Sequence, residues 1–308
     1  MNAISAEVPK FMARTFDWRE DGFHFAEAAP PELMSAAALS NSNPWIVLAA
    51  VVERAKQGDH GQVPLLSRYY AEHRIHRLAQ VALMLTGDIG RERDLKLLAE
   101  ALSHADPLTR VYAAQGAALA GRAWLVPDML EAWDAADTVE EHAMIGARIA
   151  DMLEEPGGDL LEHADTFPFK NVDRFLEENP SFRKAESQLR ILAEGEAEFP
   201  RLVEARYAQV VKQLNDDSAF LWHGSRWSMK NFVDSFLAEL DHEVPLSLPN
   251  FRHRFEAYTG VDCTGFFYID GDPDLIGIAA AIEDFLEGGT MGSYAVGRRY
   301  FFGHPIPD

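Results

Sequence analysis

Two groups of side chains have the types and spacing of metal ligands. His73 and His76 are three residues apart, so on a helix both would lie on one face. Asp270, Asp272 and Asp274 alternate like the first ligands of a calcium loop. Neither set is complete, because the histidines have no third ligand nearby, and a proline interrupts the aspartates, which no glutamate follows at the closing position. We therefore predict no metal ion, and we expect Asp272 or Asp274 to cap a helix.

A third candidate for chemistry is the hexapeptide LWHGSR, residues 221–226. It is similar to the NAD-binding segment of poly-ADP-ribose-polymerase-type transferases, and this resemblance would make His223 and Gly224 hold the nicotinamide ribose and carboxamide. The tyrosine-bearing second strand and the late glutamate of that family have no counterpart here. The other interpretation is a turn between a short strand and a helix capped by Ser225 or Ser228. We expect no enzyme and no cofactor, and keep an NAD-dependent ADP-ribosyl-type transferase as the alternative.

The remaining composition argues for binding rather than catalysis. Phosphate-binding loops, serine-nucleophile elbows and zinc-protease motifs are missing from the sequence. The only cysteine, Cys263, excludes an internal disulfide and suits a small buried side chain. The first residues lack a signal peptide's basic and apolar regions, and apolar runs are too short to span a membrane. We therefore expect a cytoplasmic protein.

Acidic residues dominate the charge and are unevenly distributed. The chain has 28 basic and 49 acidic residues, a net charge of −21, of which −13 falls within residues 125–200. Such a charge repels phosphate backbones and anionic lipid headgroups, so nucleic acid and membranes are poor partners. A localised negative field instead favours a basic protein surface.

An internal repeat is the strongest structural pattern. An offset of 34 residues superposes Ala79 on Ala113 and then on Ala147, each within an amphipathic segment. A second apolar segment recurs between these copies, at Leu65-Leu66, Leu97-Leu98, Met129-Leu130 and Leu160-Leu161. Each unit therefore predicts two helices, which need stacked neighbours to bury their apolar faces. We expect Pro64, Pro107 and Pro127 in first helical turns, and Gly87 and Gly121 just after helix ends.

The segment Asp106 to Val111, DPLTRV, resembles the turn of HEAT repeats, with its Asp-Pro and the arginine that enters the second helix. The resemblance covers about residues 43–166 and implies a scaffold with a protein-binding surface. The fold class we expect is mainly α, with HEAT-like helical hairpins in an α-solenoid.

The two ends of the chain differ from the repeat. Residues 15–25 alternate apolar and polar residues around Asp21-Gly22, which predicts a β-hairpin that caps the helices. Beyond residue 168 we expect a long helix from Pro200, helices near 228–240, 248–258 and 273–287, and short strands in the aromatic runs 219–222, 264–269 and 294–302. The predicted domains are an N-terminal cap (1–42), the helical repeats (43–168), and a C-terminal α+β unit (169–308).

The closing segment GRRYFFGHPIPD, residues 297–308, resembles that of bacterial immunity proteins paired with secreted antibacterial toxins. The resemblance implies a partner protein, a basic nuclease-like toxin, whose active surface an acidic patch occludes. The acidic residues we predict for this patch are Asp134, Asp137, Glu140, Glu141, Glu154, Glu155 and Asp159. Trp133 belongs to the core by its repeat position, or else anchors the interface. A generic helical adaptor is a further alternative.

Overall fold

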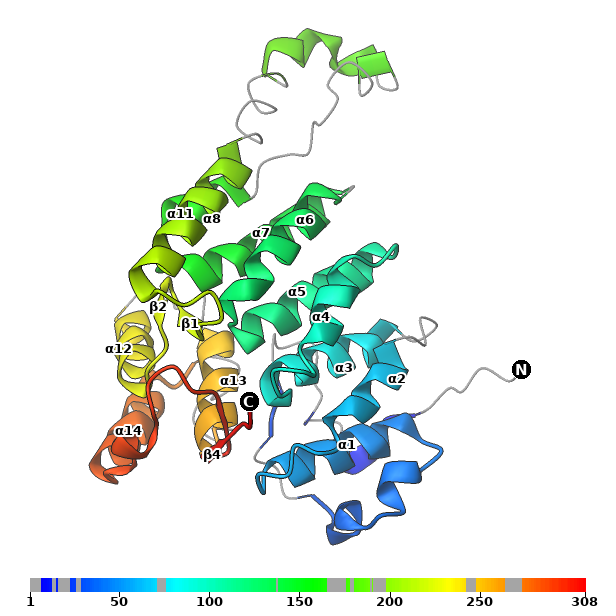
Figure 1. Ribbon diagram of the computed structural model, residues 1–308, viewed down its shortest axis with the longest axis vertical. Helices are drawn as coiled ribbons and strands as arrows, with labels where there is room; N and C mark the ends of the chain where they lie inside the picture. Colours follow the sequence, from blue (N-terminus) through cyan, green and yellow to red (C-terminus); the bar gives the residue numbers. More distant parts are fainter. Residues whose placement is uncertain are drawn as a thin grey trace. The chain divides into compact units, whose positions relative to one another are not determined.

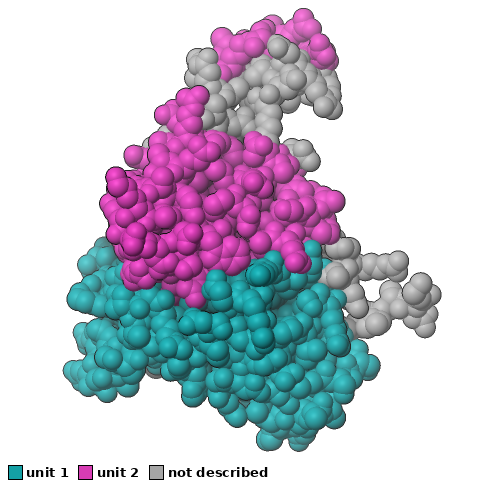
Figure 2. All heavy atoms as spheres, viewed as in Figure 1, with its two compact units in different colours: residues 1–97, 227–308 teal, residues 98–226 magenta. Residues whose placement is uncertain are grey.

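The computed structural model describes residues 7–12, 15, 23–25, 29–70, 76–136, 138–164, 176–177, 180–188, 190, 198–241, 248–263 and 273–308. The described chain is mainly helical, as predicted (Figure 1). It forms two compact units, coloured separately in Figure 2: residues 1–97 with 227–308 are unit 1, and residues 98–226 are unit 2. The predicted domain boundaries at residues 42 and 168 stay a prediction.

Unit 1 combines helices from both ends of the chain. Its first part holds the 3-10 turns η1 (Lys10–Met12), η2 (Pro31–Met34), η3 (Ala38–Ser40) and η4 (Val63–Leu66), and the helices α1 (Pro44–Ala55), α2 (Ser67–Tyr70) and α3 (His76–Ile89). Its second part holds α12 (Met229–Leu240), α13 (Leu248–Thr259), α14 (Leu275–Glu287), η7 (Thr290–Ser293), and the strands β3 (Tyr300–Phe301) and β4 (His304–Pro305). These bounds confirm the three helices predicted in the C-terminal part.

Unit 2 contains a group of helices around α7. Its elements are α5 (Pro107–Ala120), η5 (Ala123–Leu125), α6 (Val126–Asp134), α7 (Val139–Leu153), α8 (Asp159–Ala164), η6 (Pro180–Ala185), α11 (Glu198–Leu214), β1 (Leu221–Trp222) and β2 (Ser225–Arg226). Helix α4 (Lys96–Leu102) contains the boundary between the units. Within unit 2, α7 contacts α5, α6, α8 and α11 (Figure 1).

Short polar side chains cap the starts of α5, α12 and α14. Asp106 accepts a hydrogen bond from the backbone N–H of Thr109 (3.0 Å), and Pro107 occupies the first turn of α5. Ser228 forms a reciprocal capping box with Asn231 at α12, and Asp274 caps α14. The caps at Ser228 and Asp274 confirm two predictions, and each capping side chain accepts a hydrogen bond from a backbone N–H that the start of a helix leaves without a partner.

The two predicted glycine ends have different outcomes. Gly121 follows α5 in the left-handed conformation (φ 60°), as expected. Gly87 was predicted to end its helix, and this was wrong, because α3 continues to Ile89. Of the three prolines, Pro107 and Pro127 lie in the first turns of α5 and α6, whereas Pro64 lies in the 3-10 turn η4.

Two short hairpins carry the described strands. Leu221 pairs with Arg226 in the first and Tyr300 pairs with Pro305 in the second. Each has a two-residue turn with positive φ at both positions, His223-Gly224 (45° and 71°) and Phe302-Gly303 (51° and 74°). These angles define type I′ turns, whose twist matches that of paired strands. The strand predicted within residues 264–269 lies outside the described residues.

The N-terminal aromatic residues pack into unit 1. Phe23 and Phe25 are buried, with the Phe23 ring 5.6 Å from that of His253 and the Phe25 ring 5.1 Å from that of Phe301. The backbone N–H of His24 donates to Thr15 (3.2 Å). Residues 16–22, which include the turn of the predicted N-terminal hairpin, lie outside the described residues. Within the part of the chain that the structure describes, no helix has the length and apolar character to cross a bilayer.

Candidate partner-binding site

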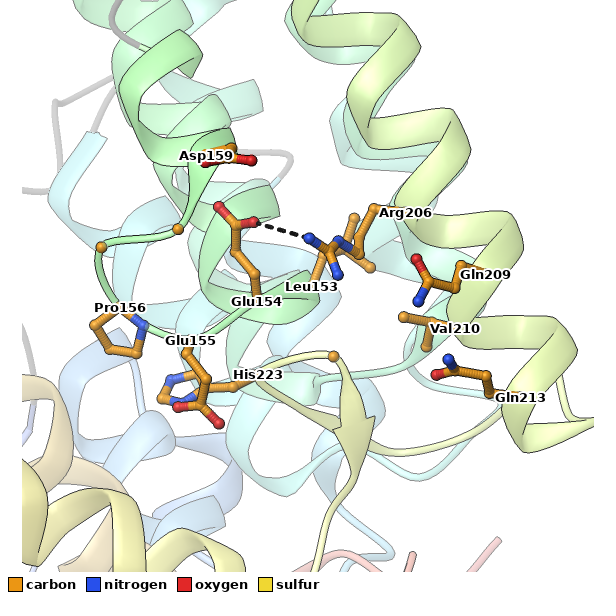
Figure 3. Close-up of a pocket in the computed structure, with 13 residues that line it drawn as sticks. Leu153, Glu154, Glu155, Pro156, Asp159, Arg206, Gln209, Val210, Gln213 and His223 are labelled. Carbon is orange, nitrogen blue, oxygen red and sulfur yellow. Dashed lines mark hydrogen bonds and ion pairs between the residues drawn. The ribbon is translucent and has the colours of Figure 1, made fainter.

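The two sets of residues singled out by the sequence meet at one pocket of unit 2 (Figure 3). The pocket has a volume of about 440 Å³ and lies among the end of α7, the loop that leads to α8, the C-terminal half of α11, and the turn of the first hairpin. From the predicted acidic patch it contains Glu154, Glu155 and Asp159, and from the LWHGSR segment it contains His223 and Gly224.

Glu154 is the buried carboxylate of this pocket. Its backbone N–H donates to Ala150 (3.0 Å) where α7 ends, and its Oε1 accepts from the backbone N–H groups of Leu160 (2.5 Å) and Leu161 (3.3 Å) where α8 begins. The side chain is 7% exposed. Glu154 therefore joins two helix ends, which fixes the loop that carries Glu155 and Asp159.

The second carboxylate oxygen of Glu154, Oε2, lacks the backbone hydrogen bonds that Oε1 accepts. Among the described residues its Oε2 has no hydrogen-bond partner, and the nearest cation is the Nη2 of Arg206 at 3.8 Å, drawn as a dashed line in Figure 3. That distance exceeds a hydrogen bond, so the buried carboxylate is only partly compensated. A guanidinium or ammonium group that entered the pocket would supply the missing donor.

His223 and Glu155 form the opposite side of the pocket. The His223 ring lies 4.1 Å from that of Trp222 in a stacked arrangement, and its Nδ1 is 3.1 Å from Oε2 of Glu155. The His223 side chain is 6% exposed, whereas that of Glu155 is 71% exposed. Glu155 is thus available to a partner, while His223 is packed behind it.

Gly224 has a structural role at the end of α7. Its backbone N–H donates to the carbonyl of Met152 in α7 (2.9 Å). A β-carbon at this position would collide with the carbonyl of Leu153, so only glycine fits. The amide that the transferase resemblance would direct to a nicotinamide carboxamide is therefore already bound to the end of α7.

The predicted acidic residues divide by burial. Asp134, Glu140, Glu155 and Asp159 are exposed, whereas Glu141 and Glu154 are buried. Asp137 lies outside the described residues. The exposed members lie at the turn between α6 and α7 and at the loop between α7 and α8.

Glu141 belongs to the core of unit 2 rather than to its surface. Its Oε1 accepts from Nε of Arg110 (2.6 Å), and the two side chains are 2% and 7% exposed. Arg110 also donates to the carbonyls of His104 (2.8 Å) and Ala105 (3.3 Å). This arginine, singled out in the DPLTRV segment, links that turn to the first turn of α7.

Trp133 is also a core residue. It is 1% exposed, and its ring packs against His142 (4.6 Å) and Phe199 (4.7 Å). The structure therefore agrees with its repeat position and leaves no exposed ring to anchor a partner.

The polar side chains on α11 were missed by the sequence analysis. Arg206, Gln209 and Gln213 line the pocket at intervals of three and four residues, so they share one helix face. The sequence analysis predicted a long helix from Pro200 and assigned no site to its polar face. The same periodicity read for polar residues would have identified this face.

A buried histidine in unit 1 is paired with a carboxylate, as in a catalytic base, but both of its ring nitrogens are hydrogen-bonded within the protein. His253 Nε2 lies 3.0 and 3.1 Å from the carboxylate oxygens of Asp88. Its Nδ1 accepts from the backbone N–H of Phe23 (2.7 Å), so both ring nitrogens are occupied. This pair holds the N-terminal segment in place.

The pocket in unit 2 suits recognition of a cation. Its described lining contains three carboxylates, one arginine, one histidine and two amides, and no serine, threonine or cysteine to act as a nucleophile. No group of three or more His, Cys, Asp or Glu side chains with metal-binding geometry occurs among the described residues.

Comparisons with protein-family models, with curated proteins and with solved structures find no match to this chain.

Proposed function

We propose that this chain is a protein-binding scaffold that neutralises a basic protein, as an immunity protein occludes the active surface of a nuclease-like toxin. The observation that carries the proposal is the exposure of carboxylates on unit 2. Asp134, Glu140, Glu155 and Asp159 are all exposed there. They belong to residues 125–200, a segment that contains 19 acidic and 6 basic residues.

Such a surface accelerates the encounter with a basic partner. A field of one sign raises the association rate constant by about 10- to 1000-fold at low ionic strength, and like charges exclude wrong partners. The partly compensated Glu154 adds a specific point, because a partner's arginine or lysine entering the pocket would donate to its Oε2.

We infer further that the helices from α3 to α8 follow a HEAT-like plan. The 34-residue offset places Ala79 in α3, Ala113 in α5 and Ala147 in α7. Arg110 of α5 binds Glu141 of α7. A stack of this kind exposes the turns that connect its helices, and the exposed carboxylates lie at such turns, with Asp134 and Glu140 at the turn between α6 and α7 and Glu155 and Asp159 at the turn between α7 and α8.

Charge reversal on unit 2 tests the proposal. The partner is captured from cells that produce the chain and is then purified, and its association rate constant is measured for the wild type and for the double variant Glu140→Lys, Glu155→Lys. Both side chains are exposed, so the variant keeps the core intact. We expect the rate constant to fall by about tenfold at low salt, because the steering charge is reversed.

The control carries the same change of charge on unit 1. Glu283 and Glu287 are exposed on α14, and the variant Glu283→Lys, Glu287→Lys should alter the rate constant by less than about threefold. An equal fall in both variants, or an acidic partner, contradicts the proposed surface. Inhibition of the partner's own activity on binding separates a neutralising protein from an adaptor.

A further inference from the structure

A second hollow of unit 2 lies between α6 and α11. It has a volume of about 400 Å³, within the range of ordinary ligand pockets. Its apolar lining consists of Val126, Pro127, Leu130, Pro200 and Val203, with Tyr207 beside them. We call it the α6–α11 groove.

The walls of this groove are fixed by the core beneath it. Trp133 of α6 packs against Phe199 of α11 with ring centroids 4.7 Å apart, and both side chains are at most 1% exposed. These buried residues hold the two helices together. Leu130 and Tyr207, by contrast, are half-buried and present apolar surface to solvent.

The rim of the groove carries one sign of charge. Glu131, Asp134 and Glu204 line it and are exposed, and none of its described lining residues is lysine, arginine or histidine. Burial, with the Glu131 carboxylate adding to it, raises the pKa of the neighbouring Asp128 carboxyl above its ordinary value. A cation over the groove would therefore be favoured by several carboxylates at once.

An apolar floor within an acidic rim defines the chemistry of its occupant. We infer that the α6–α11 groove receives the apolar face of a basic amphipathic helix from the partner protein. Apolar side chains spaced three and four residues apart would enter the floor, and flanking lysine or arginine side chains would meet the rim. This inference rests on the proposed function and names the segment of the basic partner that unit 2 recognises.

Synthetic peptides test the occupant directly. The probe is an amidated helix of leucine and lysine with leucine at helical spacing, and its binding to the full chain is followed by fluorescence anisotropy. One control is a scrambled peptide of the same composition, and another replaces lysine by glutamate. We expect the patterned lysine peptide to bind about tenfold more tightly than the scrambled one, and the glutamate peptide not to bind.

Variants of the chain locate the binding. Leu130→Lys places a cation in the floor of the groove, and Glu131→Lys reverses an exposed charge on its rim. If circular dichroism shows that the first variant is unfolded, the second variant still tests the groove. Each variant should weaken the binding of the patterned peptide about tenfold. Ala208→Lys adds a positive charge on the exposed side of α11, outside the groove lining, and should weaken it less than about threefold.

The outcomes separate this inference from the proposed function. Equal binding of patterned and scrambled peptides, or equal weakening by Ala208→Lys, overturns the groove as the docking site. In that event an association rate that still falls with Glu140→Lys, Glu155→Lys leaves the acidic surface standing. Conversely, groove binding of the patterned peptide with a partner association that is insensitive to charge reversal removes only the proposed electrostatic surface.

Discussion

Two neighbouring carboxylates at the start of α7 have opposite surroundings. Glu140 is exposed, whereas Glu141 is 2% exposed and bound to Arg110 of α5. Successive residues on a helix differ by about 100° in direction, so one residue faces solvent when the next faces the neighbouring helix. Composition assigns both to an acidic surface, and only the packing of α5 against α7 separates them.

Removing the charge of Glu141 should therefore affect stability, and that of Glu140 should not. Glu141→Gln leaves the buried Arg110 guanidinium without its counter-ion, which should lower the free energy of unfolding by about 3 kcal/mol. Glu140→Gln should change it by less than about 0.5 kcal/mol. Urea unfolding of both variants measures the difference, and equal effects would contradict the buried ion pair.

His60 gives unit 1 a pH-dependent residue. It is 2% exposed, its Nδ1 lies 2.9 Å from the carbonyl of Ile89, and its Nε2 has no hydrogen-bond partner among the described residues. Burial lowers the pKa of His60, and the positive charges of Arg299 and Arg91 lower it further. The hydrogen bond to the Ile89 carbonyl raises the pKa and so opposes these effects. The folded state therefore favours the neutral ring.

Stability should consequently fall as the pH drops below the ordinary histidine pKa of about 6.5. There the unfolded chain takes up a proton that the folded chain resists, so the unfolded state is stabilised relative to the folded state. His60→Asn keeps a donor near the Ile89 carbonyl but does not titrate, and its unfolding free energy should depend less on pH than that of the wild type. Urea unfolding at about pH 5 and about pH 7.5 compares the two. A steeper dependence in the variant would refute this assignment.

At the scale of elements, the two type I′ hairpins serve the ends of helices. In the first, Gly224 donates to Met152 near the end of α7, and Leu221 donates to Gly121 just beyond α5. In the second, Gly303 donates to Tyr258 near the end of α13 (2.8 Å). Carbonyls in the last turn of a helix lack partners within it, and each hairpin supplies them.

Arg299 extends this arrangement at the second hairpin. It donates to the carbonyls of Gly90 (2.6 Å) and Gly87 at the end of α3. A guanidinium can satisfy two carbonyls together because its donors are fixed in a fork. The LWHG segment (221–224) and the YFFG segment (300–303) therefore both form a turn that is bound to a helix end.

Glycine in the first turn should be needed for close approach as well as for its backbone angle. Gly224 and Gly157 both have positive φ (71° and 80°), but an added β-carbon would meet the Leu153 carbonyl at Gly224 and nothing within 4 Å at Gly157. Gly157→Ala should cost about 1 kcal/mol from the left-handed conformation. Gly224→Ala should cost about 1 to 3 kcal/mol more, because the α7 end must move. Thermal unfolding measures both, and equal costs would show that contact is unimportant.

At the scale of the whole molecule, charge is the property most directly linked to the proposed function. Of the net charge of −21, −13 falls within residues 125–200, and exposed carboxylates of that segment line both hollows of unit 2, Glu155 and Asp159 in the first and Glu131 and Asp134 in the second. Because exposed charges are screened over about 8 Å at physiological salt, association with a basic partner should slow as ionic strength rises. The control variant on α14 should retain this salt dependence.

The structure extends the sequence analysis most where residues distant in the chain meet. Ser228 and Asp274 were among the caps proposed from the sequence, because capping depends on side chains within one turn. The helices α12 to α14 followed from their apolar period for the same local reason. Arg206 was missed as a pocket residue because its distance from Glu154 depends on how α11 packs on α7 and α8.

The sequence by itself determined a mainly helical chain, several helix starts, the 34-residue spacing of its apolar segments and the position of the excess negative charge. These depend on local spacing and composition, which a single sequence contains. Tertiary structure decided that Glu141 and Trp133 are buried, that Gly224 closes α7, and that Glu154, Glu155 and His223 share one pocket. Burial and juxtaposition depend on which helix faces meet, and that is set by side-chain packing across the whole unit.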